Sequence, residues 1–478
     1  MPHPRSLGVV GGLGVIAGAD LFVKLIRASV AAAARDIVFE QHPFMGARGA
    51  GAADAPQHAR KLYVFEVLRA FEQRGIGAAL LPCFISHTFL GELLPSTRVA
   101  VIDMMTALRA HLARRHPEAR RVGVLTSDYV RGHGLFERSL PAPLEVIHPR
   151  PAAQAALMRA VYGDGGLQTG RLDAAAVGLL DEALRDLAAQ GAEVILPGFT
   201  EIPVALDALA ERSVPVVDCN LVYAQHALDG GQEGRPRPFK VGVIGGVGPA
   251  ATVDFMDKIV RNTPAQRDQD HVRMTVEHDP QIPDRTEHLV GDGPDPTVAL
   301  YAAAKRLEAA DADLIAIPCN TAHAFVERIQ PYLAIPIVNM LHETVRHAAA
   351  RFGASAPVGL LATDGTIASR VYHDAARAAG LRLLTPDAAH QARVMEAIYG
   401  PAGVKAGHTT GDCRDALMAA IAHLAGRGAA AVILGCTELP LIQPADEALV
   451  VGGRRVAVLD PTDLLARACV AQAAASRR

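Results

Sequence analysis

VGVIGGVG at residues 241–248 repeats LGVVGGLG at residues 7–14, and this pair of stretches decides the fold. In both, an apolar run ends in closely spaced glycines, a pattern typical of a buried strand followed by a tight turn. Three further pairs of blocks follow in the same order: LPCFISH (81–87) with IPCNTAH (317–323), YG (162–163) with YG (399–400), and GFTEIP (198–203) with GCTELP (435–440). Matching blocks in one order predict two homologous halves in tandem.

The boundary between the halves is expected in the stretch DGGQEGRPRP at residues 229–238, which is rich in glycine, proline and charge. Such a composition is typical of an exposed linker. We therefore predict a first domain at residues 1–232, a linker at 233–239 and a second domain at 240–478. A chain of 478 residues is also too long for one ordinary hydrophobic core.

Short apolar runs alternate with longer helix-like segments in each half. In the second half the predicted strands are Lys240–Ile244, Arg273–Val276, Leu314–Ile317, Val358–Leu361 and Ala431–Leu434, and helices are expected within Asp295–Ala310 and Cys413–Ala425. This alternation predicts an α/β fold in which each half forms two lobes, each with a parallel sheet covered by helices. A cleft is expected between the two lobes.

Cys319 and Cys436 occupy equivalent places in the two lobes, since each follows a predicted strand and precedes a predicted helix. Open parallel sheets bind ligands at the carboxyl ends of their strands, where helix N-termini also point. The two thiols are therefore expected on opposite walls of one cleft.

The charge balance makes a small-molecule partner the default expectation. The chain has 47 basic and 50 acidic side chains and no run of like charge, so neither nucleic acid nor a membrane surface is indicated. Six scattered cysteines do not form a disulfide framework, and glycines and charges interrupt the apolar N-terminal segment. We expect a protein of the cytoplasm.

A thiol pair across a cleft could be a disulfide, a metal site, a nucleophile with a spare thiol, or an acid and a base. Neither cysteine has a second cysteine two to four residues away, although His323 lies four residues after Cys319, so we expect no metal. A Cys–His nucleophile would leave Cys436 unexplained. Two buried, inert cysteines are the remaining alternative. Racemisation uses both thiols: a thiolate removes the Cα proton, and a thiol returns one to the opposite face, without a cofactor.

The second half resembles the aspartate racemases of the aspartate/glutamate racemase superfamily over nearly its whole length. Six blocks carry the resemblance: GGVGP (245–249), PQIPDRT (280–286), PCNTAH (318–323), LATDGT (361–366), GVKAG (403–407) and GCTELP (435–440). The resemblance implies a two-lobed α/β fold with Cys319 and Cys436 as catalytic acid and base. It also implies that Arg285 and Lys405 hold the carboxylates of the substrate.

Other residues of these blocks are candidate substrate-binding groups. Beside the cysteines and after strand ends stand Asn320, Thr321, Thr437 and Thr363, whose alternative role is to cap helices or turns. We expect the glycines around Gly246 to let the backbone approach the ligand, although Gly246–Ala251 also fits a relaxed dinucleotide fingerprint. His323 and Glu438 could orient the thiols, or they could simply belong to a polar helix face.

The first half departs from the family pattern at the positions that carry the chemistry. Cys83 remains, but Phe84 and Ile85 replace the Asn and Thr after it, Phe199 stands at the place of Cys436, and Gln168 at that of Lys405. Arg48, in PFMGAR at residues 43–48, could keep the cation. One thiol cannot perform two-base inversion, and the bulky replacements are expected to fill the pocket. The first half is therefore predicted to be silent and to replace the second subunit of the homodimers that such racemases commonly form, as an intramolecular pseudo-dimer.

Three functional hypotheses follow. The leading one is racemisation of aspartate, with glutamate or a broader range of amino acids as alternatives. The second is another activity of the same superfamily, an isomerase or decarboxylase of small dicarboxylates. The third is a non-enzymatic, regulatory amino-acid-binding protein, which the degenerate first half brings into consideration.

Overall fold

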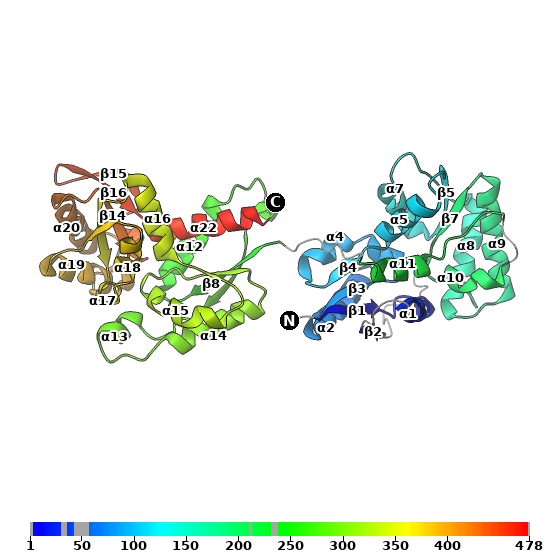
Figure 1. Cartoon of the computed structure of the whole chain (residues 1–478), viewed down its shortest axis with the longest axis horizontal. Helices are drawn as coiled ribbons and strands as arrows, with labels where there is room; N and C mark the ends of the chain where they lie inside the picture. Colours follow the sequence, from blue (N-terminus) through cyan, green and yellow to red (C-terminus); the bar gives the residue numbers. More distant parts are fainter. Residues whose placement is uncertain (1–2, 30–35, 43–56, 210–212, 231–237, 477–478) are drawn as a thin grey trace. The chain divides into compact units, whose positions relative to one another are not determined.

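The computed structural model describes residues 3–29, 36–42, 57–209, 213–230 and 238–476 (Figure 1). The chain forms two compact units, Met1–Arg237 and Pro238–Arg478. The expected linker at 233–239 lies outside the described residues up to position 237. Within the described residues, no helix is both long and apolar enough to cross a membrane.

The first unit contains two parallel sheets. One has the strand order β2-β1-β3-β4 and the other β6-β5-β7. The strands are β1 (His3–Val10), β2 (Ile37–Glu40), β3 (Ile76–Leu80), β4 (Ala100–Ile102), β5 (Arg121–Thr126), β6 (Glu145–Ile147) and β7 (Val194–Gly198). The helices are α1 (Val15–Ser29), α2 (Gln57–Gln73), α3 (Phe84–His87), α4 (Leu90–Leu93), α5 (Met104–Arg115), α6 (Asp128–Gly132), α7 (Leu135–Ser139), α8 (Pro151–Tyr162), α9 (Ala174–Ala189), α10 (Ile202–Ala205) and α11 (Cys219–Leu228).

The second unit repeats this plan with one strand order β11-β10-β8-β9 and another β13-β12-β14-β16-β15. The strands are β8 (Lys240–Gly245), β9 (Arg273–His278), β10 (Leu314–Ala316), β11 (Ile337–Val338), β12 (Pro357–Ala362), β13 (Arg382–Leu384), β14 (Ala431–Gly435), β15 (Asp446–Val451) and β16 (Arg454–Leu459). The helices are α12 (Pro249–Asn262), α13 (Arg285–Val290), α14 (Thr297–Ala309), α15 (Val326–Ile329), α16 (Met340–Phe352), α17 (Asp364–Ala368), α18 (Val371–Ala378), α19 (Ala388–Tyr399), α20 (Asp412–Gly426), α21 (Leu439–Ile442) and α22 (Pro461–Ala475).

The predicted α/β class is confirmed, and each predicted strand of the second half corresponds to an observed one, β8, β9, β10, β12 or β14. The sheets are parallel apart from one edge, where β15 runs antiparallel to β16. Gly452 and Gly453 join these strands with φ of +55° and +74°. Two successive residues of positive φ form the turn type that suits a tight hairpin, which is why two glycines stand there.

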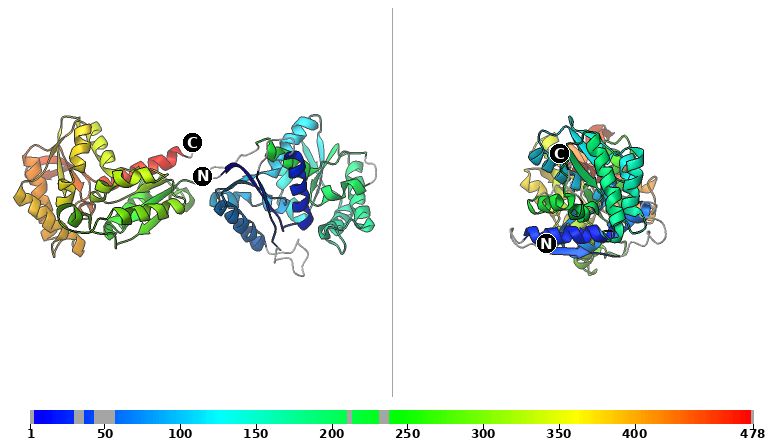
Figure 2. Two further views of the ribbon diagram at one scale, coloured as in Figure 1. Left: turned by 60° about the horizontal axis from the view of Figure 1, so that its bottom comes forward. Right: turned by 90° about the vertical axis from the view of Figure 1, so that its right-hand side faces the viewer.

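Each lobe of the second unit has its own apolar core, and the last helix ties the lobes together. Strands of the β8 sheet pack against α22 through Leu465 and Cys469, although α22 follows the last strand of the other sheet. The chain therefore crosses between the lobes twice. Helices flank the strands in each unit (Figure 2), so the carboxyl ends of the strands remain as the edge where side chains can meet.

Candidate active site

One pocket in the second unit is lined by both predicted thiols. Cys319 lies three residues beyond the end of β10, and Cys436 directly follows β14. The pocket is lined by Val247, Asp284, Arg285, Thr286, Cys319, Asn320, Thr321, Thr363, Tyr399, Lys405, Cys436, Thr437 and Glu438. The lining thus includes the two thiols and most of the candidate substrate-binding residues, contributed by both lobes.

Arg285 begins α13, whose N-terminus is capped by the Asp284 carboxylate. Its Nη1 donates to the carbonyl oxygens of Ile282 at 3.2 Å and Pro283 at 3.1 Å, which hold the guanidinium in place. Burial acts to lower the pKa of Arg285, but negative charge at Cys319 and Asp284 outweighs it and raises the pKa. The guanidinium is therefore a fixed cation beside the Cys319 thiol.

Cys436 has the opposite electrostatic surroundings. Its Sγ donates to Glu438 Oε2 at 3.1 Å, while Lys405 Nζ donates to Glu438 Oε1 at 2.8 Å. Burial, and then the Glu438 charge, raise the pKa of Cys436 well above its ordinary value. Burial acts to raise the pKa of Glu438 as well, but Lys405 outweighs it and lowers the pKa. Glu438 is thus a carboxylate that holds Cys436 as a thiol.

Asn320 presents its amide nitrogen as an unpaired donor. Tyr372 donates its hydroxyl to Asn320 Oδ1 at 2.6 Å, which fixes the orientation of the amide. Asn320 Nδ2 and Arg285 Nε are both buried without a hydrogen-bond partner among the described residues. Asn320 makes no side-chain cap, so the capping role considered for it is absent here. A buried donor without a partner costs about 1–3 kcal/mol, which a ligand oxygen would recover.

The threonines form a hydroxyl network at the pocket. Thr321 Oγ1 lies 2.7 Å from Thr366 Oγ1 and 3.2 Å from Thr363 Oγ1, and Thr363 also caps α17. Thr437 Oγ1 donates to Glu438 Oε2 at 3.4 Å. Thr363 therefore combines the turn role and the place in the lining that were considered as alternatives.

His323 supports the backbone and does not contact a thiol. Its Nε2 accepts from Met340 N at 3.1 Å, so its Nδ1 donates to Cys319 O at 2.9 Å. Burial lowers the pKa of His323 to about 4, which leaves the ring neutral. This geometry does not provide the base that a Cys–His nucleophile needs.

The glycine loop after β8 packs against protein groups. Gly246, expected to contact the ligand, is not part of the pocket lining, and its φ of +83° and the nearby Asp279 backbone explain the glycine. A Cβ at Gly248 would lie 2.7 Å from Glu438 Oε1. The loop therefore gives room to Glu438 from the other lobe, while its neighbour Val247 lines the pocket.

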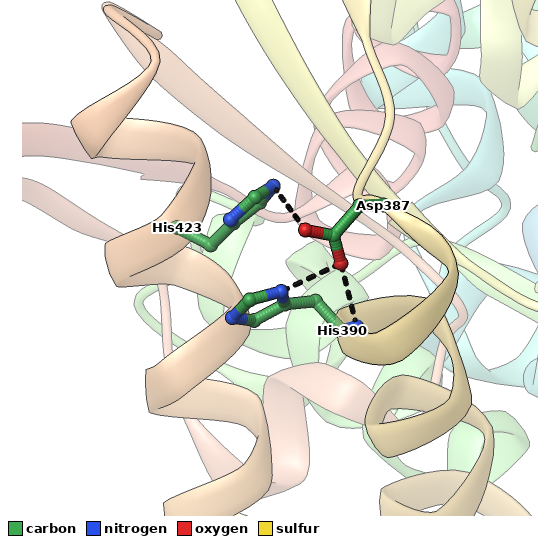
Figure 3. Close-up of side chains that lie close together, drawn as sticks. All are labelled: Asp387, His390 and His423. Carbon is green, nitrogen blue, oxygen red and sulfur yellow. Dashed lines mark hydrogen bonds and ion pairs between the residues drawn. The ribbon is translucent and has the colours of Figure 1, made fainter.

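One cluster of metal-ligand type occurs among the described residues, and none of its members lines the pocket. Asp387 Oδ1 accepts from the backbone and ring nitrogens of His390, while Asp387 Oδ2 lies 3.7 Å from His423 Nε2 (Figure 3). The two rings stack with centroids 4.0 Å apart. Asp387 already caps α19, and its two carboxylate oxygens are engaged by the two histidines. The cluster is explained as a helix cap with two neighbouring histidines.

The first unit contains a corresponding pocket, so the expectation that bulky residues fill it is wrong. Cys83, Phe84, Ile85, Gln168 and Phe199 are all in its lining. Arg48 lies outside the described residues, but sequence reasoning missed Arg60, whose Nη1 lies 3.5 Å from Cys83 Sγ. Because Arg60 lies within a helix, beyond the degenerate block, the motif comparison gave no signal for it.

Comparison with known proteins agrees with the duplicated architecture. The family model described as Asp/Glu/Hydantoin racemase matches twice, at residues 10–227 and 244–469. The broad specificity amino-acid racemase RacX of Bacillus subtilis is 28% identical over 208 residues, covering 42% of this chain and 85% of the relative.

A glutamate racemase of Geobacter metallireducens is 32% identical over 137 residues, covering 28% of this chain and 47% of that protein. Among solved structures, the aspartate racemase of Picrophilus torridus is 32% identical, with a TM-score of 0.42, covering 49% of this chain and 94% of that one. The two family matches together span most of the sequence. The chain therefore belongs to the Asp/Glu/Hydantoin racemase family, with the family's domain present twice in tandem.

Proposed function

We propose that the second unit racemises aspartate without a cofactor, with Cys319 and Cys436 as base and acid. The observation that carries the proposal is that both thiols line one pocket in which two buried donors, Asn320 Nδ2 and Arg285 Nε, have no partner among the described residues. A carboxylate held by these donors would place the substrate between the thiols. Membership of a racemase family supports the same chemistry.

The surroundings of the two thiols define a starting state. Cys319 stands beside the Arg285 guanidinium, and we assign it the role of base. Cys436 donates a hydrogen bond to Glu438 over 3.1 Å and stays a thiol. In this state the Cys319 thiolate takes the Cα proton, and the electron pair remains on the carboxylate-stabilised carbanion. Cys436 then gives its proton to the opposite face, so that the turnover leaves a Cys319 thiol and a Cys436 thiolate.

The proposed product state is the starting state for the opposite enantiomer. Lys405 stabilises it, because its ammonium lies 2.8 Å from Glu438 and opposes the rise in the pKa of Cys436 that burial and Glu438 cause. The two enantiomers have equal free energies in water, so kcat/KM must be the same in both directions. Lys405 and Arg285 therefore serve a reaction that needs each cysteine to be ionised in turn.

The same residues support a dicarboxylic substrate. Arg285 offers a planar fork and Asn320 a further donor, which together suit the α-carboxylate. Lys405 has three donor hydrogens and uses one on Glu438, which leaves donors for a second carboxylate. We propose aspartate on this basis, with glutamate as the neighbouring alternative.

The decisive experiment incubates the purified chain with L-aspartate in deuterated water, without pyridoxal phosphate and with a chelator. Chiral chromatography with mass spectrometry should show D-aspartate carrying deuterium at Cα. Cys319→Ser and Cys436→Ser should each abolish racemisation. Cys413→Ser is the matched control, because that buried thiol donates only to the carbonyls of His408 and Thr410 and a hydroxyl can replace it.

Full activity in either Cys319→Ser or Cys436→Ser would disprove the assigned pair. Formation of fumarate or another product instead of D-aspartate would favour an isomerase or lyase of dicarboxylates. We also propose that the first unit is silent in racemisation and acts as a pseudo-subunit. The Cys319→Ser, Cys436→Ser double variant leaves that unit intact, so any remaining racemisation would contradict its silence.

A further inference from the structure

The first unit keeps a polar pocket in which only part of the second unit's machinery is present. Its lining comprises Leu13, Gly14, Arg60, Pro82, Cys83, Phe84, Ile85, Ser127, Tyr162, Gln168, Gly198, Phe199, Thr200 and Glu201. Tyr162, Thr200 and Glu201 match Tyr399, Thr437 and Glu438 in residue type and order. This lining therefore retains several groups of a binding site.

A buried cation stands beside the single thiol of this pocket. Arg60 is 1% exposed, and its Nη1 lies 3.5 Å from Cys83 Sγ. Arg60 comes from α2, whereas its functional counterpart Arg285 begins α13. The first unit thus places an arginine beside its thiol from a different helix. A guanidinium that could bind a carboxylate is therefore present, although the sequence block that carries Arg285 in the second unit is lost in the first.

The described lining of this pocket holds no second cation. In the second unit Lys405 neutralises Glu438, but Gln168 and Phe199 stand where Lys405 and Cys436 would be. Glu201 remains buried, and burial raises its pKa while Arg60 opposes this effect. Within the described lining, a second carboxylate on a ligand would therefore meet a buried carboxyl group and no lysine. Phe84, Ile85 and Phe199 offer an apolar wall in its place.

We propose that the first unit binds a small monocarboxylic acid with an apolar substituent, with Arg60 holding the carboxylate beside Cys83 and Phe84, Ile85 and Phe199 enclosing the substituent. Dicarboxylates such as aspartate do not bind there. The chain therefore has two sites of different selectivity. The inference concerns the first unit alone and stands whether or not the second unit is a racemase.

Cys83 provides the first readout, because it is the one cysteine of the six, all within the described ranges, that is not buried. Iodoacetate carries a carboxylate and iodoacetamide does not. Either reagent forms an S–C bond as iodide leaves and the thiol proton goes to the buffer. Tryptic peptide 75–98 contains only this cysteine, so mass spectrometry of the full chain reports its rate directly.

A carboxylate held by Arg60 should make the iodoacetate-to-iodoacetamide rate ratio at Cys83 about tenfold or more above that of a free thiol. Arg60→Gln should remove this excess. The second readout uses wild-type chain: 2-methylpropanoate should slow the reaction of Cys83 with iodoacetamide, while succinate and L-aspartate should not.

Gln168→Lys provides a gain-of-function variant at a half-buried position, and it does not depend on the tolerance of Arg60 to substitution. The new ammonium would pair with Glu201 as Lys405 pairs with Glu438, so L-aspartate and succinate should now protect Cys83. The proposal would be overturned if the iodoacetate-to-iodoacetamide rate ratio at Cys83 equalled that of a free thiol and 2-methylpropanoate gave no protection. It would also be overturned if Cys83 reacted with neither reagent. Equal protection of wild-type chain by aspartate would overturn the one-cation selectivity.

Discussion

Substitution of Glu438 by Gln tests the electrostatic difference between the two thiols. Gln keeps the size of the side chain against Gly248 and can still accept from Cys436, but it removes the negative charge 3.1 Å from Sγ. At an effective dielectric constant of about 20, two unit charges at that separation repel by about 5 kcal/mol, and Lys405 opposes part of this. The substitution also leaves the Lys405 charge uncompensated.

Both changes lower the pKa of Cys436, which burial and Glu438 raise in the wild-type chain. A charge at this range moves a pKa by about 1–3 units, or roughly 1.4–4 kcal/mol. The active enzyme carries one proton on the pair of thiols, so kcat/KM falls above the second macroscopic pKa of the pair. In Glu438→Gln this alkaline fall should begin about 1–3 pH units lower than in the wild type.

The assay measures initial rates with both enantiomers at low concentration across pH 6–10, by chiral chromatography. Glu327→Gln, at an exposed position on α15, is the matched control for loss of one negative charge. The two directions should give equal kcat/KM in every variant. An alkaline limb that stays in place, or that moves to higher pH, would refute the assignment of Glu438 as the group that keeps Cys436 protonated.

Three further predictions concern the supports of the site. Arg285→Lys keeps a charge but loses the fork, and KM should rise about 10–100-fold; an unchanged KM would contradict carboxylate binding by Arg285. Burial lowers the pKa of His323 to about 4, so the stability it contributes is complete above about pH 6.5 and is lost as the pH falls through 4. In urea unfolding, the free energy of unfolding of His323→Gln should therefore fall by about 3 kcal/mol less than that of the wild type between about pH 6.5 and pH 4. Parallel curves of unfolding free energy against pH would contradict the neutral ring. Tyr372→Phe leaves Asn320 Oδ1 unpaired and should lower the free energy of unfolding by about 1–3 kcal/mol and raise KM several-fold; an unchanged KM would separate Asn320 from substrate binding.

The placement of Cys319 and Cys436 after strands could be predicted from the sequence, because a strand of a parallel sheet is marked by a short local pattern that occurs in both lobes. A short apolar run followed by a small or reactive residue indicates the carboxyl end of a strand wherever it occurs. The antiparallel strand β15 was not predicted. Its apolar run, at residues 448–451, is short, and most side chains along Asp446–Val451 are exposed, so it does not have the pattern of a buried parallel strand.

Contacts between residues far apart in the sequence could not be predicted from it. Lys405 and Glu438 are 33 positions apart, and their ion pair depends on how η8 (Val404–Ala406) meets the turn after β14. The hydrogen bonds of His323 to the backbone could not be predicted for the same reason, because the donor to its Nε2 is the backbone nitrogen of Met340 at the start of α16. Arg60 is the clearest example, because it lies in α2 and outside the block at residues 43–48 that corresponds to the block of Arg285.

The number of cations in the described lining of each pocket explains why their proposed ligands differ. The lining in the second unit holds two cations, Arg285 and Lys405, and two carboxylates, Asp284 and Glu438, so their formal charges sum to zero (+1 +1 −1 −1). Aspartate then adds two carboxylates and one ammonium, so each carboxylate can meet a cation. The described lining in the first unit holds one cation, Arg60, and one carboxyl group, Glu201, whose raised pKa favours the neutral acid. This one cation can balance one carboxylate. Gln168 in the place of Lys405 thus changes the ligand selectivity of the first pocket, and Phe199 in the place of Cys436 removes the second thiol that racemisation needs.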